Sequence, residues 1–301
     1  MNLLQVTWNA SPEIFEIGSL SVRWYGVFWA LSFYLGYEIM IRIFKRDSVD
    51  VKHADKLLIY IAVGAVVGAR IGHCFFYDFG YYSKNLIDVF EVWEGGLSSH
   101  GGAMGILLAL FFYQKKVGTK SYGWLLDRLV IPISLGAFFI RMGNLMNSEI
   151  YGHQTDLPWG FIFARAGEVV PKHPTQFYEG IPYLVLFLIL GWLYLKKIKK
   201  LPTGFLLSFF AIFMFIVRFL VEFVKENQSP FEANMPLNMG QLLSLPLIIA
   251  GVIVMVIIVN KHKARMAQGY HPETEIESVS ARQSESKTSP SKPKNRAAKY
   301  K

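Results

Sequence analysis

The stretch IRMGNLMNSEIYG, residues 140–152, closes a long run of apolar sequence with an arginine, two asparagines, a serine and a glutamate. The apolar run before it, 122–142, is long enough to cross a bilayer as a helix. A polar group without a partner in hydrocarbon is costly, and a charge inside a membrane segment is a sign of a functional site. The stretch therefore predicts a membrane helix with a polar end, and it raises the question of what Arg141 holds.

Composition places the whole chain in the membrane class. The chain has 301 residues, of which 52% are hydrophobic and only 18% are charged, which is too apolar for an ordinary soluble domain. The net charge of +9 comes from short basic clusters between apolar runs, a pattern that favours membrane orientation over nucleic-acid binding. The single cysteine, Cys74, excludes an intramolecular disulfide framework and a CxxC metal site. The N-terminal residues lack the basic region and apolar core of a cleavable signal peptide.

The apolar runs predict an all-α fold, a polytopic membrane protein with seven transmembrane helices, because backbone groups in lipid must be satisfied within each segment. The alternating pattern of a membrane strand is absent. The third helix is short for a full span and is expected to begin earlier, within 95–100. The expected spans are 24–44, 57–76, 101–114, 122–142, 178–195, 203–223 and 240–260.

The loops predict the orientation of these helices. Basic clusters follow the first, third, fifth and seventh helices, whereas the other loops are longer and poorer in basic residues. The positive-inside rule then places the N-terminus outside and the C-terminus in the cytoplasm. We expect a membrane domain over 1–263, with the extracytoplasmic loop 143–177 as a small head. The polar, Ser- and Lys-rich residues 264–301 are expected to form a disordered cytoplasmic tail.

Polar residues far apart in the sequence fall at one depth, near the outer ends of the predicted helices. They are Tyr25, Arg70, His73, His100, Gly101, Gly102, Arg141, Arg218, Glu222 and Gln241. A single arginine near a helix end is explained by snorkelling, and tyrosine and tryptophan there by an aromatic belt. Three arginines at one depth, together with His100 and Glu149, favour a shared site in the outer leaflet.

The residue types at this depth suit a phosphate. Guanidinium groups grip phosphate oxygens in a bidentate way, and the N-terminus of the third helix adds backbone N–H groups and a positive dipole end. Glycines in GGLSSHGGA, residues 95–103, allow close approach of a ligand, and His100 is able to accept a proton near neutral pH. The pattern predicts a site that binds a phospholipid headgroup, although a turn with a satisfied histidine also explains this stretch. Gly64, Gly68 and Gly72 indicate close packing against another helix.

An anion transporter, a structural membrane protein and other membrane enzymes, such as a protease or an acyltransferase, fit parts of this pattern. An anion transporter also places arginines between helices, but it predicts internal repeats and broken helices at mid-membrane, and no repeat is present. A structural membrane protein does not explain a histidine and three arginines at one depth. An intramembrane protease needs its own nucleophile or an H-E-x-x-H pair, and the sequence has neither; a lipid acyltransferase shares only the topology.

Five stretches resemble the prolipoprotein diacylglyceryl transferases of bacteria: WEGGLSSHGGAMG (93–105), RMGNLMNSEIYG (141–152), HPTQFYEG (173–180), RFLVEF (218–223) and MGQLLSLP (239–246). The resemblance covers about residues 10–260. It implies transfer of the diacylglyceryl group of phosphatidylglycerol to the lipobox cysteine of prolipoprotein signal peptides. A thioether forms and glycerol 1-phosphate leaves, at the outer face of the bacterial cytoplasmic (inner) membrane, with no metal and no cofactor.

The resemblance also implies the roles of single residues. The implied catalytic residues are His100, Arg141, Glu149 and Arg218, with His100 or Glu149 as the proton acceptor. The implied phosphatidylglycerol-binding residues are Tyr25, Arg70, Gly101, Arg141, Asn144, Gly152, Arg218 and Glu222. Asp127 fits a further family position. The sequence departs from the family pattern at Ile140, where glycine is usual, and at Met214, where many members have tyrosine.

Overall fold

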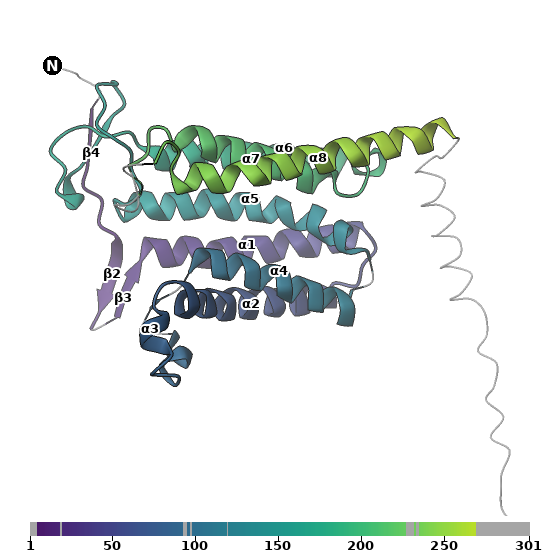
Figure 1. Ribbon diagram of the computed structural model, residues 1–301, viewed down its shortest axis with the longest axis horizontal. Coiled ribbons are helices and arrows are strands. Elements are labelled where there is room, and N and C mark those ends of the chain that lie inside the picture. Colours follow the sequence, from purple (N-terminus) through teal and green to yellow (C-terminus); the bar gives the residue numbers. More distant parts are fainter. Residues whose placement is uncertain are drawn as a thin grey trace, which may run out of the picture.

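Seven long helices run side by side in the computed structural model, which describes residues 5–18, 20–92, 95–96, 98–118, 120–226, 232 and 235–268 (Figure 1). They are α1 (Trp24–Arg46), α2 (Lys52–Phe76), α4 (Ser99–Lys116), α5 (Tyr122–Met146), α6 (Thr175–Lys197), α7 (Phe205–Val221) and α8 (Met239–Ala267). The predicted tail lies outside the described residues from 269 onward, and α8 continues past the boundary predicted at 263.

Every predicted span coincides with the greater part of one of these helices. Five of them, α1, α2, α5, α6 and α8, are long and apolar enough to cross a membrane, and α7 is apolar but shorter. The predicted class of helical membrane protein is therefore confirmed.

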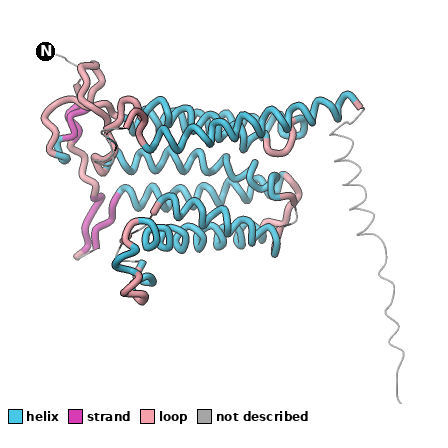
Figure 2. The backbone as a smooth tube through the Cα atoms, viewed as in Figure 1, coloured by secondary structure: helices cyan, strands magenta, loops and turns pink. Residues whose placement is uncertain are grey.

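Short elements gather at one end of the bundle, which we call the strand end (Figure 2). There, β1 (Val6–Trp8) pairs in parallel with β4 (Phe161–Phe163), and β2 (Glu13–Ile17) pairs antiparallel with β3 (Leu20–Arg23). The other short helices of the described residues are α3 (Phe79–Tyr82), η1 (Asp88–Phe90) and η3 (Ala164–Ala166), together with η4 (Ile198–Lys200), which follows α6 at the opposite end of the bundle. The C-terminus of α5 and the N-terminus of α6 lie at the strand end, joined by the segment 147–174.

Glycines hold α2 and α4 together at backbone contact. A Cβ atom on Gly68 would lie 2.4 Å from the Gly101 carbonyl oxygen, and one on Gly105 would lie 2.1 Å from that of Gly64. No side chain fits at such separations. The interpretation of the glycine stripe as a packing surface is confirmed, and Gly101 belongs to it.

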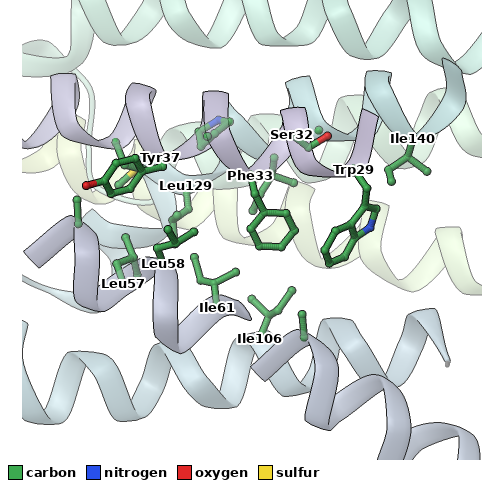
Figure 3. A pocket seen from close by; sticks show the side chains of 17 residues that line it. Trp29, Ser32, Phe33, Tyr37, Leu57, Leu58, Ile61, Ile106, Leu129 and Ile140 are labelled. Atoms are coloured by element: carbon green, nitrogen blue, oxygen red, sulfur yellow. The ribbon is translucent and has the colours of Figure 1, made fainter. Parts of the chain in front are cut away.

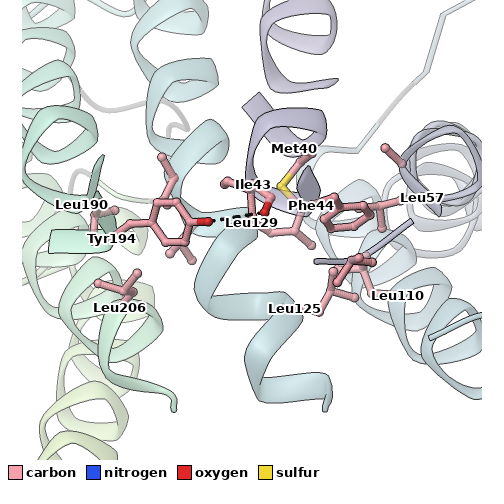
Figure 4. Packing of buried hydrophobic residues seen from close by; sticks show 14 of the residues in the cluster. Met40, Ile43, Phe44, Leu57, Leu110, Leu125, Leu129, Leu190, Tyr194 and Leu206 are labelled. Atoms are coloured by element: carbon pink, nitrogen blue, oxygen red, sulfur yellow. Dashed lines mark hydrogen bonds between the residues drawn. The ribbon is translucent and has the colours of Figure 1, made fainter. Parts of the chain in front are cut away.

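The apolar core lies away from the strand end and joins six of the helices (Figure 4). Its buried members include Phe44, Leu110, Leu125, Leu190 and Leu206, from α1, α4, α5, α6 and α7, and α2 adds Leu57. Met214, noted in the sequence as a departure from the pattern of the family it resembles, packs against this core.

Two buried polar contacts fasten the end of the bundle opposite the strands. Arg128 on α5 forms an ion pair of 2.9 Å with Asp47 at the end of α1, and the Tyr194 hydroxyl on α6 donates a hydrogen bond of 2.9 Å to the same carboxylate. The fully buried Asp127 accepts hydrogen bonds from the backbone N–H groups of Gly204 and Leu207, at 2.6 and 2.9 Å. Asp127 therefore caps the start of α7, far along α5 from Arg141.

Candidate active site

Arg141 is neutralised by a glutamate on the next helix. It lies near the last turn of α5, and its Nη2 atom is 2.5 Å from Oε2 of Glu179 in the early turns of α6. The Tyr183 hydroxyl, one turn further along α6, donates a hydrogen bond of 3.0 Å to the same carboxylate oxygen. Glu179 is only 1% exposed, and a buried charge without a partner is strongly destabilising. The pair therefore fixes where the guanidinium points.

A lysine extends this pair to the end of α7. Nζ of Lys225 is 3.1 Å from Oε1 of Glu179 and 3.0 Å from Oε1 of Glu222, and Glu222 is 3.7 Å from Nη2 of Arg218. Five charges of alternating sign thus follow one another in the order Arg141, Glu179, Lys225, Glu222, Arg218. We call these five residues the ion-pair network. It joins two of the three arginines singled out in the sequence, Arg141 and Arg218, one at each end.

Amide side chains connect Arg141 to a third carboxylate. Nη1 of Arg141 donates to Oδ1 of Asn144 at 3.1 Å, and Nδ2 of Asn144 donates to Oε1 of Glu149 at 2.8 Å. Asn147 donates to the same carboxylate oxygen at 3.3 Å. Asn144 therefore holds the guanidinium and the Glu149 carboxylate in one hydrogen-bonded group.

Close packing positions two further residues that the sequence predicted for the site, Tyr25 and Gly152. A Cβ atom on Gly143 would lie 2.7 Å from Cδ2 of Tyr25, so the glycine of the R-x-G-N sequence leaves room for the tyrosine ring. A Cβ atom on Gly152 would lie 2.2 Å from the Val224 carbonyl oxygen, and Gly152 forms a β-bridge with Lys225. Gly152 therefore positions the segment that carries the lysine, which is a steric role.

His100 and Arg70 lie elsewhere, on the α2–α4 pair. Arg70 is buried, and its guanidinium donates to the carbonyl oxygens of Asp88, Val89 and Gly95. His100 is exposed and lines an apolar groove of about 840 Å³ between α2 and α4. In the described ranges, no hydrogen bond or ion pair joins either residue to the ion-pair network.

An apolar pocket between α1, α2, α4 and α5 reaches the neighbourhood of Arg141. It has a volume of about 290 Å³, and its lining includes Trp29, Phe33, Ile61 and Ile140. Figure 3 shows Trp29 and Ile140 together at one end of this pocket. Ile140 directly precedes Arg141, so the pocket and the arginine are one residue apart on α5.

Backbone hydrogen bonds connect the segment that follows α5 to the residues just after α7 and just before α6. The backbone N–H of His153 donates to the Val224 carbonyl oxygen, and that of His173 donates to the His153 carbonyl oxygen.

Two side chains of this segment have shifted pKa values. Burial lowers the pKa of His173, with a smaller contribution from the nearby His153. Burial and a hydrogen bond to Glu168 raise the pKa of Tyr151 to about 12. Both side chains are therefore uncharged at neutral pH.

Sequence reasoning missed two central members of the site, Glu179 and Lys225. Glu179 lies within the quoted stretch HPTQFYEG, where a carboxylate near the end of a membrane helix was the available signal. Lys225 follows Glu222 by three residues, a spacing that brings side chains together on a helical turn. No group of three or more His, Cys, Asp or Glu suited to a metal ion occurs among the residues that the structure describes.

The fold and the site define a helical membrane protein with a buried network of alternating charges at one end of its bundle. Residues 12–257 match the family model of the prolipoprotein diacylglyceryl transferases. The chain belongs to this family, and the resemblance noted in the sequence is confirmed.

Relatives of known name align with more than four fifths of this chain. The chain is 42% identical over 258 residues to the phosphatidylglycerol–prolipoprotein diacylglyceryl transferase of Tolumonas auensis, an alignment that covers 86% of this chain and 99% of that protein. The enzyme of the same name from Chloroherpeton thalassium is 44% identical over 248 residues, covering 82% and 92% of the two chains. That from Porphyromonas gingivalis is 42% identical over 261 residues, with the same coverage.

Proposed function

We propose that this protein transfers the diacylglyceryl group of phosphatidylglycerol to the thiol of the lipobox cysteine in prolipoprotein signal peptides. The observation that carries the proposal is the ion-pair network, which has an arginine at each end and lies in a chain that belongs to the transferase family. In the reaction the bond between a carbon of the diacylglyceryl group and the phosphate oxygen breaks. A carbon–sulfur bond forms, and glycerol 1-phosphate leaves.

Arg141 and Arg218 bind the phosphate of the lipid in this proposal. Guanidinium groups suit phosphate oxygens in geometry and charge, and they stabilise the negative charge that grows on the leaving phosphate. Arg218 is about a third exposed (34%) whereas Glu222 is 5% exposed, so the arginine is the accessible member of that pair. Tyr25 and Asn144 adjoin Arg141 and complete the headgroup site. Hydrocarbon tails suit the apolar pocket whose lining includes Ile140.

Other residues that the sequence assigned to lipid binding contribute indirectly. Gly101 and Gly152 allow close packing of the backbone, and Arg70 organises the segment 88–96 through its carbonyl contacts. Glu222 holds Lys225 and Arg218 in place.

Glu149 is the proton acceptor in our proposal. It belongs to the same hydrogen-bonded group as Arg141, through Asn144, whereas His100 lies on the α2–α4 pair. The substrate thiol gives its proton to the Glu149 carboxylate. The resulting thiolate, which is the nucleophilic form of cysteine, attacks the carbon of the diacylglyceryl group that carries the phosphate. The protein needs no nucleophile of its own.

The topology that accompanies this function has seven spans in the bacterial cytoplasmic membrane. The N-terminus and the segment 147–174, as a small head, face outward, the active site lies toward the outer leaflet, and the C-terminus is cytoplasmic. The basic residues in the last turns of α1, α4 and α6 support this orientation.

Cysteine labelling tests the orientation. We expect a membrane-impermeant maleimide to label Val169→Cys in intact cells and Lys197→Cys only after permeabilisation, in a Cys74→Ser background. Both positions are exposed and lie at opposite ends of the bundle. Labelling in the reverse pattern would invert the topology.

The reaction is tested with purified protein in phosphatidylglycerol vesicles and a synthetic lipobox peptide, following release of glycerol phosphate. We expect release that requires the peptide's cysteine and stops with a serine peptide, because the nucleophile is the thiolate. Phosphatidylethanolamine vesicles serve as the matched lipid control. If a peptide and lipid that a relative accepts give no release with this protein, the proposed function is overturned.

A further inference from the structure

Lys225 is the middle charge of the ion-pair network and contacts both of its carboxylates, one on α6 and one at the end of α7. Its Nζ atom is 3.1 Å from Glu179 on α6 and 3.0 Å from Glu222 at the end of α7, and the side chain is 3% exposed. The backbone of Lys225 is bridged to Gly152. Both the side chain and the backbone of this lysine are therefore held in place.

The two carboxylates have few other partners. Glu179 also contacts Arg141 and the Tyr183 hydroxyl, and Glu222 also contacts Arg218 and accepts a hydrogen bond from Asn238 on α8 at 3.1 Å. Without Lys225, the two buried carboxylates would depend on the arginines alone for a neutralising charge. Each would then draw its arginine more strongly away from an incoming phosphate.

We propose that Lys225 is a positioning residue that keeps Arg141 and Arg218 available to the lipid phosphate by neutralising Glu179 and Glu222 in their place. The inference rests on the proposed function. Three cations and two carboxylates leave one positive charge over in the network. A phosphodiester carries one negative charge, so the bound lipid balances the network when Lys225 is present.

The decisive variant is Lys225→Met, which keeps the length of the side chain and removes its charge. We expect it to raise the KM for phosphatidylglycerol by about tenfold or more, with a smaller change in kcat, because the loss falls on binding of the anion. Lys225→Arg is expected to retain most of the activity. The double variant Lys225→Met with Glu179→Gln is expected to recover part of the lost affinity, because it removes one negative charge as well.

The pH dependence of activity is a readout that a purely structural role of Lys225 would not change. Two neighbouring carboxylates with no cation between them take up a proton more readily than a single one, and that proton substitutes for the ammonium group. The groups that face the lysine are Glu179 and Glu222, with Arg141, Arg218 and Tyr183 next to them. We therefore expect the ratio of Lys225→Met to wild-type activity to rise as the pH is lowered from 8 to about 6.

A matched control is Lys172→Met, the same substitution at another lysine between two glutamates. Lys172 pairs with Glu168 and Glu226 outside the network. Its loss is expected to leave the KM for phosphatidylglycerol unchanged. If Lys225→Met does not fold, Lys225→Gln takes its place with the same expectations.

The proposal is overturned if the Lys225 variants keep the wild-type KM, or if their loss is independent of pH and is not relieved by Glu179→Gln. The wild-type measurement separates this outcome from failure of the function itself. Wild-type activity with unaffected Lys225 variants removes only the positioning role, whereas an inactive wild type removes the proposed reaction.

Discussion

Replacing Arg141 with alanine is expected to lower the release of glycerol phosphate by about 10²- to 10³-fold, the usual effect of removing one group that stabilises charge in a transition state. Arg141 is the residue through which the ion-pair network and the Asn144–Glu149 hydrogen bond meet. In the proposed mechanism its loss removes a contact to the lipid phosphate, and it separates these two halves of the site. The measurement is kcat and KM with phosphatidylglycerol and a lipobox peptide.

Arg128→Ala is the matched control for this experiment. Arg128 lies on the same helix and also pairs with a carboxylate, Asp47, but at the other end of the bundle. Its loss is expected to lower thermal stability while the activity per folded molecule stays near that of the wild type. Arg141→Lys is expected to remain strongly impaired, because an ammonium group does not reproduce the planar fork that contacts Asn144 and Glu179 together. Full activity of Arg141→Ala would remove this arginine from the mechanism.

Glu149→Gln is expected to lower kcat by about 10²- to 10⁴-fold, the range for loss of a positioned general base. Glutamine has nearly the same shape, so the contacts with Asn144 and Asn147 are largely preserved while the proton acceptor is lost. His100→Gln serves as the comparison and is expected to reduce kcat by less than tenfold, because His100 lies apart from Arg141. A reversed order of the two effects would make His100 the base.

The sequence was sufficient to predict the helices, because hydropathy marks the apolar runs and residue number gives position along the bundle axis. It does not determine the angle around that axis. Arg70 and Arg141 were predicted at one depth, yet Arg70 contacts carbonyl oxygens of the segment 88–96, whereas Arg141 faces Glu179 on α6. Glu179 and Lys225 were missed for the same reason, since only the packed helices reveal that the two are partners.

The glycines show the same limit of prediction from sequence. The stripe on α2 was identified from its four-residue spacing, which is a local property. The tight fit of Gly152 against Val224 depends on a contact across 72 positions of sequence, from 152 to 224, and no local pattern reports it. A glycine of this kind is easily assigned to a ligand when its role is to let two segments touch.

The alternating order of charges also bears on how the protein enters the membrane. A lone charged residue at the centre of a membrane helix costs about 2.5–3.5 kcal/mol during insertion. Arg141 and Glu179 belong to the consecutive helices α5 and α6, and Arg218 and Glu222 lie one turn apart on α7. In the proposed topology each helical hairpin therefore carries a cation together with its own counterion to the far side. We expect the two hairpins to enter the membrane with these pairs formed, and the contact between Lys225 and Glu179 then joins one hairpin to the other.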